Sequence, residues 1–306
     1  MKIGCKILIG AGILSLISCG SRSSSSKPEE PALPAFTLPV APTILSGQTE
    51  RTAYLAEHYW QGLDYADTAW LANPAVLEQI FVQWIALLEQ QPVAEGAEVT
   101  GNVIILGNGH PAMQLRLAEL AEHYFHNPNS PCRNEEFYIP ILRAIIAAPD
   151  MEDIYKERPR YQLEKALMNR PGTRAADFAF VTRSRQMLRL SDIQSDYVLL
   201  YFFNPDCHDC KRVAAYMTGS SVLSDLSAKS RLTVLAVYPD KDLQAWEKYV
   251  YDVPDEWIVA RYADDDARRA YDLPAIPNLY LLDREKDVVL KDAPVEKIED
   301  WLKGEI

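Results

Sequence analysis

The sequence predicts an all-α helical domain followed by an α/β domain that is built on a mixed β-sheet. Up to about Tyr161, apolar residues recur at the spacing of amphipathic helices. Beyond Pro171-Gly172 the pattern changes to short β-rich apolar runs that alternate with helical segments. The chain has 306 residues, 48% of them hydrophobic, which is enough to fill two ordinary cores. We therefore expect a helical domain at residues 47–170 and an α/β domain at residues 171–306.

Residues 1–18 have the features of a signal peptide. Lys2 and Lys6 give a positive start, and the apolar run at residues 7–17 is too short to span a bilayer. The run ends in Leu16-Ile17-Ser18-Cys19, which resembles the lipobox of bacterial lipoprotein precursors. The resemblance implies that Cys19 is acylated and becomes the first residue of the mature chain. The alternative is an ordinary secretory signal followed by an incidental cysteine.

Residues 19–46 are predicted to form a flexible tether. They are rich in serine and then in proline, and they cannot bury enough apolar surface to fold. An acyl anchor and a tether would hold the domains outside the cytoplasm, in a compartment where disulfides persist. We therefore expect a lipid-anchored protein that faces the periplasm, or alternatively the cell surface; which bacterial membrane carries the anchor stays open.

The charge of the chain argues against nucleic acid as a partner. The formal net charge is −12, and it becomes −14 when residues 1–18 are removed, because they hold Lys2, Lys6 and no acidic residue. A strongly acidic surface without a Lys/Arg cluster repels phosphate backbones.

Helical segments account for most of residues 47–170. They are expected at residues 53–60, from Asn73-Pro74 onward, and at residues 111–125, 135–148 and 155–170, with Gly107-Asn108-Gly109 as a turn. His123 and His126 share a helical face but lack a placed carboxylate partner, so no metal site is predicted. This domain could recruit a partner, occlude a site or mediate dimerisation.

The α/β domain begins its regular structure with a continuous apolar run, residues 198–203, as a strand buried on both faces should. The expected elements that follow are a helix at 207–217, a strand at 232–238, a helix at 243–251, a strand at 258–262, a helix at 264–271, strands at 279–282 and 288–291, and a helix at 295–302. This order predicts a mixed sheet with helices on both faces.

Cysteine usage points to a catalytic pair. Five cysteines are too few for a disulfide scaffold, and Cys207 and Cys210 alone have the CxxC spacing. Cys207 opens a helix, where unpaired N–H groups and the positive end of the helix dipole favour the thiolate, which is the nucleophile. We expect Cys207 to attack a substrate disulfide and Cys210 to resolve the mixed disulfide. Cys132 is read as a buried small hydrophobe, with a third redox thiol as the alternative.

Several motifs of residues 172–306 match one superfamily. They are Ala176-Asp177-Phe178, Leu188-Arg189-Leu190-Ser191-Asp192, the CxxC after a strand, and Ile276-Pro277 before a strand. Together they resemble the thioredoxin superfamily, in its TlpA/ResA-like branch. The whole chain resembles lipoproteins of Bacteroidota that join a helical domain of unknown function to this module.

The resemblance implies a thioredoxin-like fold and thiol–disulfide oxidoreductase activity without a cofactor. It also implies that Pro277 is cis and that the Ile276 backbone lies beside Cys207, where it holds the substrate as an added strand. The partners would be disulfide-containing protein substrates and an upstream thiol that donates or accepts electrons. Substrate identity and oligomeric state stay open.

The chain departs from this family at its proton acceptors. Tyr201 stands where thioredoxins have a buried Asp, and Val213 stands where ResA-like proteins have a Glu. Near Cys207, the charges of Asp206 and Asp209 disfavour the thiolate, whereas a protonated His208 favours it. These residues leave the redox potential open, and with it the choice between reduction, isomerisation and oxidation; we favour a reductant or isomerase.

The rival interpretation is a non-catalytic binding or scaffold lipoprotein with a thioredoxin-like module, because a fold does not fix a function. A structural zinc site would need two further ligands at matching spacing. Haem attachment needs a His after the second cysteine, where this chain has Lys211.

Overall fold

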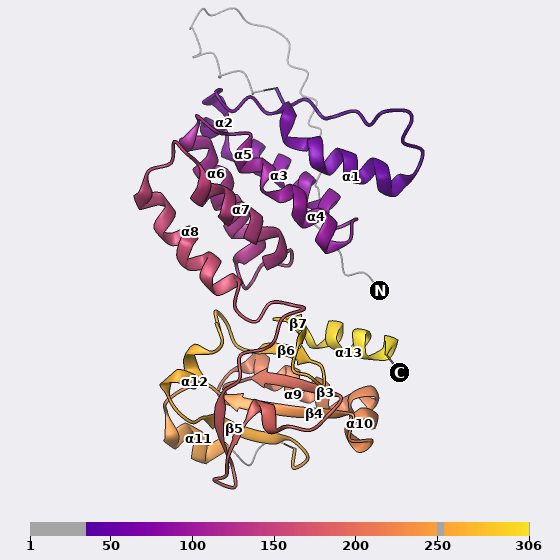
Figure 1. Ribbon diagram of the computed structural model, residues 1–306, viewed down its shortest axis with the longest axis vertical. Helices are drawn as coiled ribbons and strands as arrows, with labels where there is room; N and C mark the ends of the chain where they lie inside the picture. The colour runs from indigo at the N-terminus through magenta and orange to yellow at the C-terminus, as the bar shows by residue number, and fades with distance from the viewer. Residues whose placement is uncertain (1–34, 250–253, 306) are drawn as a thin grey trace, which may run out of the picture. The chain divides into compact units, whose positions relative to one another are not determined.

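A computed structural model describes residues 35–249 and 254–305 (Figure 1). The described residues form two compact units, one that ends at Leu163 and one that begins at Glu164. The predicted signal peptide, Cys19 and the first part of the predicted tether lie outside the described residues. None of the described helices combines the length and the hydropathy that a membrane crossing requires.

The first unit is helical, as the sequence predicts. Its α-helices are α1 (Gln48–His58), α2 (Ala69–Ala72), α3 (Pro74–Leu88), α4 (Val93–Thr100), α5 (Asn102–Ile105), α6 (Pro111–Ala121), α7 (Glu135–Ala147) and α8 (Asp153–Ala166). A 3₁₀ turn, η1 (Tyr59–Gly62), follows α1, and a π-helical turn, η2 (Glu122–His126), follows α6. Pro74 and Pro111 stand in the first turns of α3 and α6, where a missing N–H costs nothing.

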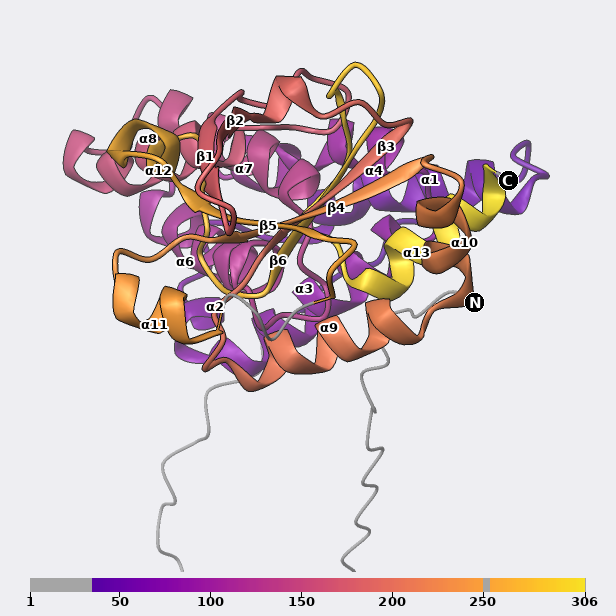
Figure 2. The same ribbon diagram turned by 90° about the horizontal axis from the view of Figure 1, so that it is seen from below.

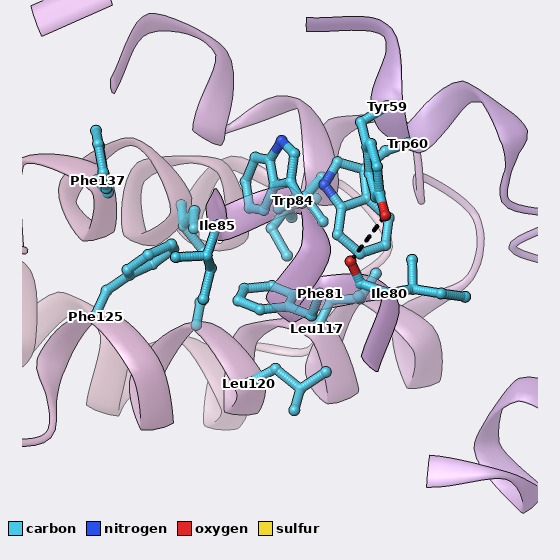
Figure 3. Close-up of a cluster of buried hydrophobic side chains, with 14 of the residues drawn as sticks. Tyr59, Trp60, Ile80, Phe81, Trp84, Ile85, Leu117, Leu120, Phe125 and Phe137 are labelled. Carbon is cyan, nitrogen blue, oxygen red and sulfur yellow. Dashed lines mark hydrogen bonds between the residues drawn. The ribbon is translucent and has the colours of Figure 1, made fainter. Parts of the chain in front are cut away.

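An aromatic cluster forms the core of this unit (Figure 3). Trp60 and Trp84 meet edge to face with ring centroids 5.4 Å apart, and Phe81 contacts both. The Trp84 indole N–H donates to the Ala56 carbonyl at 3.1 Å, and the Tyr59 hydroxyl donates to the Ile80 carbonyl at 3.0 Å. These two bonds satisfy the polar atoms that Tyr59 and Trp84 bring into the core.

Residues 35–46 belong to the predicted tether but contact the helical unit. Phe36 packs on the core, with its ring centroid 5.1 Å from that of Tyr59. The Thr37 N–H donates to the Gly62 carbonyl at 3.5 Å, and a Cβ on Gly62 would lie 1.9 Å from the Thr37 carbonyl oxygen. Gly62 is therefore required for this close approach of two backbones.

The second unit contains a seven-stranded sheet. Its strands are β1 (Ala179–Thr182), β2 (Met187–Arg189), β3 (Tyr197–Phe202), β4 (Leu232–Tyr238), β5 (Ile258–Tyr262), β6 (Asn278–Leu282) and β7 (Val288–Lys291), in the spatial order β2-β1-β5-β4-β3-β6-β7. Strand β3 pairs in parallel with β4, and β4 with β5, whereas the other pairs are antiparallel. The sheet is therefore mixed, as the order of elements predicts.

Helices cover both faces of this sheet (Figure 2). One face packs against α9 (His208–Gly219), α10 (Ser221–Ala228), α13 (Val295–Gly304) and Trp246 of α11 (Leu243–Tyr249). The other face packs against α12 (Asp265–Arg269) and the segment around β1 and β2. Side chains alternate along β3, so Tyr201 lies in the core under α9 and Phe202 in the opposite core.

Candidate functional site

Cys207 lies at the junction of a buried strand and a helix. Strand β3 ends at Phe202, and α9 begins at His208, with Cys207 as its N-cap. The Cys210 N–H donates to the Cys207 sulfur at 3.1 Å. The Cys207 side chain is half-buried, so its sulfur is held at the start of the helix and still reaches solvent. The local sequence produces this geometry because the apolar strand β3 is packed on both faces. The end of the strand, and therefore the start of the loop that carries Cys207, has a fixed position.

Cys210 lies one helical turn further in and is enclosed by protein. It is only 2% exposed and belongs to the core between α9 and the sheet. Burial raises the pKa of its thiol to about 12, and the neighbouring Cys207 side chain also raises it. Both cysteines are free thiols in this structure. The pair therefore consists of one accessible sulfur and one protected sulfur.

The predicted substrate-binding residues lie beside the accessible sulfur. Strand β6 follows Ile276-Pro277 and pairs with β3, with Asn278 opposite Phe202. The Ile276-Pro277 peptide bond is cis. The Cys207 thiol donates to the Ile276 carbonyl, with 3.6 Å between sulfur and oxygen. The fold thus brings together Cys207 and a segment almost 70 residues away in sequence.

The three ionisable residues around Cys207 are exposed. Asp209 pairs with Arg212 within α9, at 3.5 Å between Oδ1 and Nε. The Asp206 main-chain N–H donates to the Asn204 side-chain carbonyl at 2.9 Å, and His208 is exposed on the first turn of the helix. Solvent and salt screen charges at exposed positions, which weakens the effect of these side chains on the Cys207 thiol.

Asn204 organises the loop before the dithiol, although the sequence analysis did not single it out. Besides accepting from Asp206, its side-chain amide donates to the Asp240 carboxylate at 2.7 Å, just after β4. Its main-chain carbonyl accepts from the Cys207 N–H at 3.0 Å. The Asn-Pro dipeptide after a strand is a turn signal that could have revealed this role.

Tyr201 occupies the position directly beneath the dithiol. Its hydroxyl donates to the Cys210 carbonyl at 2.8 Å. Its ring stacks on Phe203 and meets Trp257 edge to face, and burial raises the pKa of the phenol above its ordinary value. Val213, the other departure from the family, is buried in the same core and carries no ionisable group.

His123, His126 and Cys132 are the side chains of the helical unit that the sequence offers for metal or thiol chemistry. His126 stacks on Tyr138, whereas His123 meets Tyr124 edge to face, because the segment is a π-helical turn. Cys132 is buried in the helical core. Within the described ranges, no group of three or more His, Cys, Asp or Glu side chains is placed to hold a metal ion.

Comparison with known proteins covers both units. A family described as thioredoxin-like matches residues 195–288, and DUF5106, a domain of unknown function, matches residues 18–169. A thioredoxin-like protein from Bacteroides caccae, of known crystal structure, is 37% identical, with a TM-score of 0.85. That similarity covers 90% of this chain and 100% of the other.

Two further relatives match a smaller part of the chain. The carboxy-terminal domain of an uncharacterized protein from Bacteroides fragilis is 37% identical, with a TM-score of 0.42 over 44% of this chain and 98% of that one. Nucleoredoxin from Xenopus laevis is 23% identical over 124 residues, 39% of this chain. The chain spans 29% of the length of that curated relative.

Proposed function

Since this chain belongs to the thioredoxin-like proteins, as its Bacteroides caccae relative does, we propose that it is a thiol–disulfide oxidoreductase that works through Cys207 and Cys210. The observation that carries the proposal is the unequal pair of sulfurs. Cys207 is accessible at the start of α9, and Cys210 is buried one turn away with its thiol held neutral. A nucleophile that reaches substrate and a protected second thiol are what two-step disulfide exchange requires.

The reaction would proceed in two balanced steps. The Cys207 thiolate attacks one sulfur of a substrate disulfide, the substrate S–S bond breaks, and the first substrate thiolate leaves and takes up a proton. Cys210 then loses its proton and attacks the Cys207 sulfur, which forms the Cys207–Cys210 disulfide and releases the second substrate thiol. Two electrons pass from the dithiol to the substrate, and an upstream thiol donor would restore the pair.

The substrate would bind beside Cys207 as an extended segment. The Ile276 carbonyl lies 3.6 Å from the Cys207 sulfur, next to Pro277 at the start of β6. A main-chain carbonyl in this position can accept a hydrogen bond from a substrate backbone N–H, as in other cases of strand addition. Disulfide-containing proteins are therefore the proposed substrates.

The proposed location is outside the cytoplasm, on a lipid anchor at Cys19. Support comes from the signal-like residues 1–18, the Leu16-Ile17-Ser18-Cys19 motif and the composition of the tether. Radiolabelled palmitate incorporation into the wild-type precursor, and its loss in Cys19→Ala, would test the anchor. Incorporation that persists in Cys19→Ala would contradict it.

A redox titration tests the activity. Soluble residues 20–306 would be equilibrated across a dithiol/disulfide series and alkylated, and the mass shift read for each peptide. We expect a reversible two-thiol transition at Cys207 and Cys210 that is absent in Cys207→Ser and in Cys210→Ser. A midpoint of about −270 mV would indicate a reductant, and one of about −120 mV an oxidant. No reversible transition would favour the binding or scaffold role instead.

A further inference from the structure

We infer that the Tyr201 hydroxyl, together with the Asn204 main-chain N–H, forms a two-donor site that stabilises the Cys210 thiolate during resolution of the mixed disulfide. This inference rests on the proposed function, because it concerns the second of its two steps. It assigns a role to the residue that stands where related thioredoxins have a buried carboxylate.

The first support is the position of the phenol. Tyr201 points from β3 into the core beneath α9, and its hydroxyl is 2.8 Å from the Cys210 carbonyl oxygen. Cys210 lies in α9, so this carbonyl can also accept the helical bond from the residue four positions later. The bond from Tyr201 is therefore additional to the helix, and it places the phenol oxygen beside Cys210 before that residue ionises.

The second support is the set of groups around the Cys210 sulfur. The Asn204 main-chain N–H and the Tyr201 hydroxyl favour the Cys210 thiolate through hydrogen bonds and so lower the pKa of that thiol against the larger effect of burial. The other group that acts strongly on it is Cys207, and no carboxylate or cation is among these groups. Both donors are neutral, and both are fixed by the strand and the loop before the cysteine ionises.

The chemical consequence is that Tyr201 donates a hydrogen bond and does not accept the proton. Burial raises the pKa of Tyr201, so the phenol stays protonated while the reaction proceeds. The Cys210 proton must therefore pass to water or a dissolved base. The sulfur then attacks Cys207, the substrate–Cys207 S–S bond breaks, and the leaving substrate thiolate takes up a proton. A preorganised donor of this kind stabilises developing charge without rearranging at the moment of reaction.

A single absorbance time course separates the attack by Cys207 from the attack by Cys210. Reduced protein is mixed with the aromatic disulfide dithiobis(nitrobenzoate), whose released thiolate is coloured. Attack by Cys207 releases the first coloured thiolate, and attack by Cys210 on the resulting mixed disulfide releases the second. Cys210→Ser identifies the first phase, because it stops at the mixed disulfide, and Cys207→Ser gives the background.

Tyr201→Phe removes the hydroxyl and keeps the ring that packs against Phe203 and Trp257. We expect the second phase to slow by about tenfold, the loss typical of a hydrogen bond to a charged group, while the first phase is unchanged. The alkylation rate of Cys210 in the Cys207→Ser variant is an independent measurement. There, alkylation of Cys210 by iodoacetamide at alkaline pH should slow by a similar factor when Tyr201→Phe is added.

Tyr271→Phe is the matched control. It also removes a buried tyrosine hydroxyl that donates to a main-chain carbonyl, that of Ala176 at 3.1 Å, but it lies in the core on the opposite face of the sheet. Both variants should lose similar stability, and Tyr271→Phe should leave both phases unchanged. This comparison distinguishes an effect on the sulfur from a general loosening of the domain.

The outcomes are distinct. Slowing confined to the second phase of Tyr201→Phe supports the two-donor site. An unchanged second phase in a wild-type protein that shows both phases overturns the inference and leaves the proposed function standing. Equal slowing of both phases, or the same slowing in Tyr271→Phe, also overturns it. A wild-type protein without a second phase refutes the proposed function, and the inference with it.

Discussion

Reduced protein should be alkylated at Cys207 and spared at Cys210. The difference arises because the thiolate is the reactive species, and burial raises the pKa of Cys210 to about 12. At pH 8 roughly one Cys210 side chain in ten thousand would be ionised, against about a quarter of ordinary cysteines. Cys210 should therefore react on the order of a thousandfold more slowly than a cysteine in a disordered peptide, before its enclosure by protein slows it further.

The assay is timed alkylation of the reduced protein with iodoacetamide, followed by peptide mapping of each cysteine. Raising the pH should speed the modification of Cys210 by about tenfold per unit until the pH approaches the pKa of its thiol. The same protein in concentrated guanidinium is the control, because unfolding removes the burial and should bring the two cysteines to similar rates.

Two results would refute this reasoning. Modification of folded Cys210 within about tenfold of the rate of a free cysteine would mean that burial does not hold its thiol neutral. A rate at Cys210 that does not rise with pH would mean that the accessibility of the sulfur, and not its ionisation, limits the reaction.

Three further changes test the packing and the electrostatics. Gly62→Ala would place a Cβ 1.9 Å from the Thr37 carbonyl oxygen, and the displaced backbone should cost about 2 kcal/mol in urea unfolding of the helical unit. Asn204→Ala removes the bond to Asp240 and the loop bond at 2.9 Å, so it should lower the unfolding free energy of the α/β unit by about 1 kcal/mol. The reduced protein should lose stability as the pH rises from about 9 to about 12, because unfolded Cys210 releases a proton that folded Cys210 retains.

Each of these changes has its own control. Gly219→Ala adds a Cβ that meets nothing within 4 Å, so it should be neutral, and an equal loss there would remove the steric explanation of Gly62→Ala. Asp240→Ala should lower the unfolding free energy by less than Asn204→Ala does, since the bond from the Asp206 N–H to the Asn204 side chain remains. Cys210→Ala should flatten the alkaline loss of stability; an undiminished loss would assign it to the buried tyrosines, whose pKa values are also raised.

Much of the fold could be predicted because its strands and helices have strong local patterns. The expected strands at residues 232–238, 258–262 and 288–291 coincide with β4, β5 and β7. Strands β1 and β2 and helix α10 were not predicted, since runs of three to eight residues are too short to give a clear pattern. The short helices α2, α4 and α5 of the helical unit were not predicted either, because their four to eight residues give too little periodicity to identify.

The family resemblance was confirmed over both units, whereas the anchor at Cys19 and the domain boundaries stay predictions. The family match of the helical domain ends at residue 169, and the compact unit in the structure ends at Leu163. Helix α8 continues past Leu163 to Ala166, and a continuous helix gives no local signal of where one core stops.

The sequence by itself determined the dithiol, its place at the start of a helix and the apolar strand that leads to it, because these depend on residues within about ten positions of each other. Only the tertiary structure decided which sulfur is accessible, how close Ile276 lies to Cys207, and that the Tyr201 hydroxyl reaches Cys210. Burial and through-space distances depend on how β3, β6 and α9 pack together. The local sequence pattern does not contain that information, since each strand and helix would have the same pattern if the elements were packed in another arrangement.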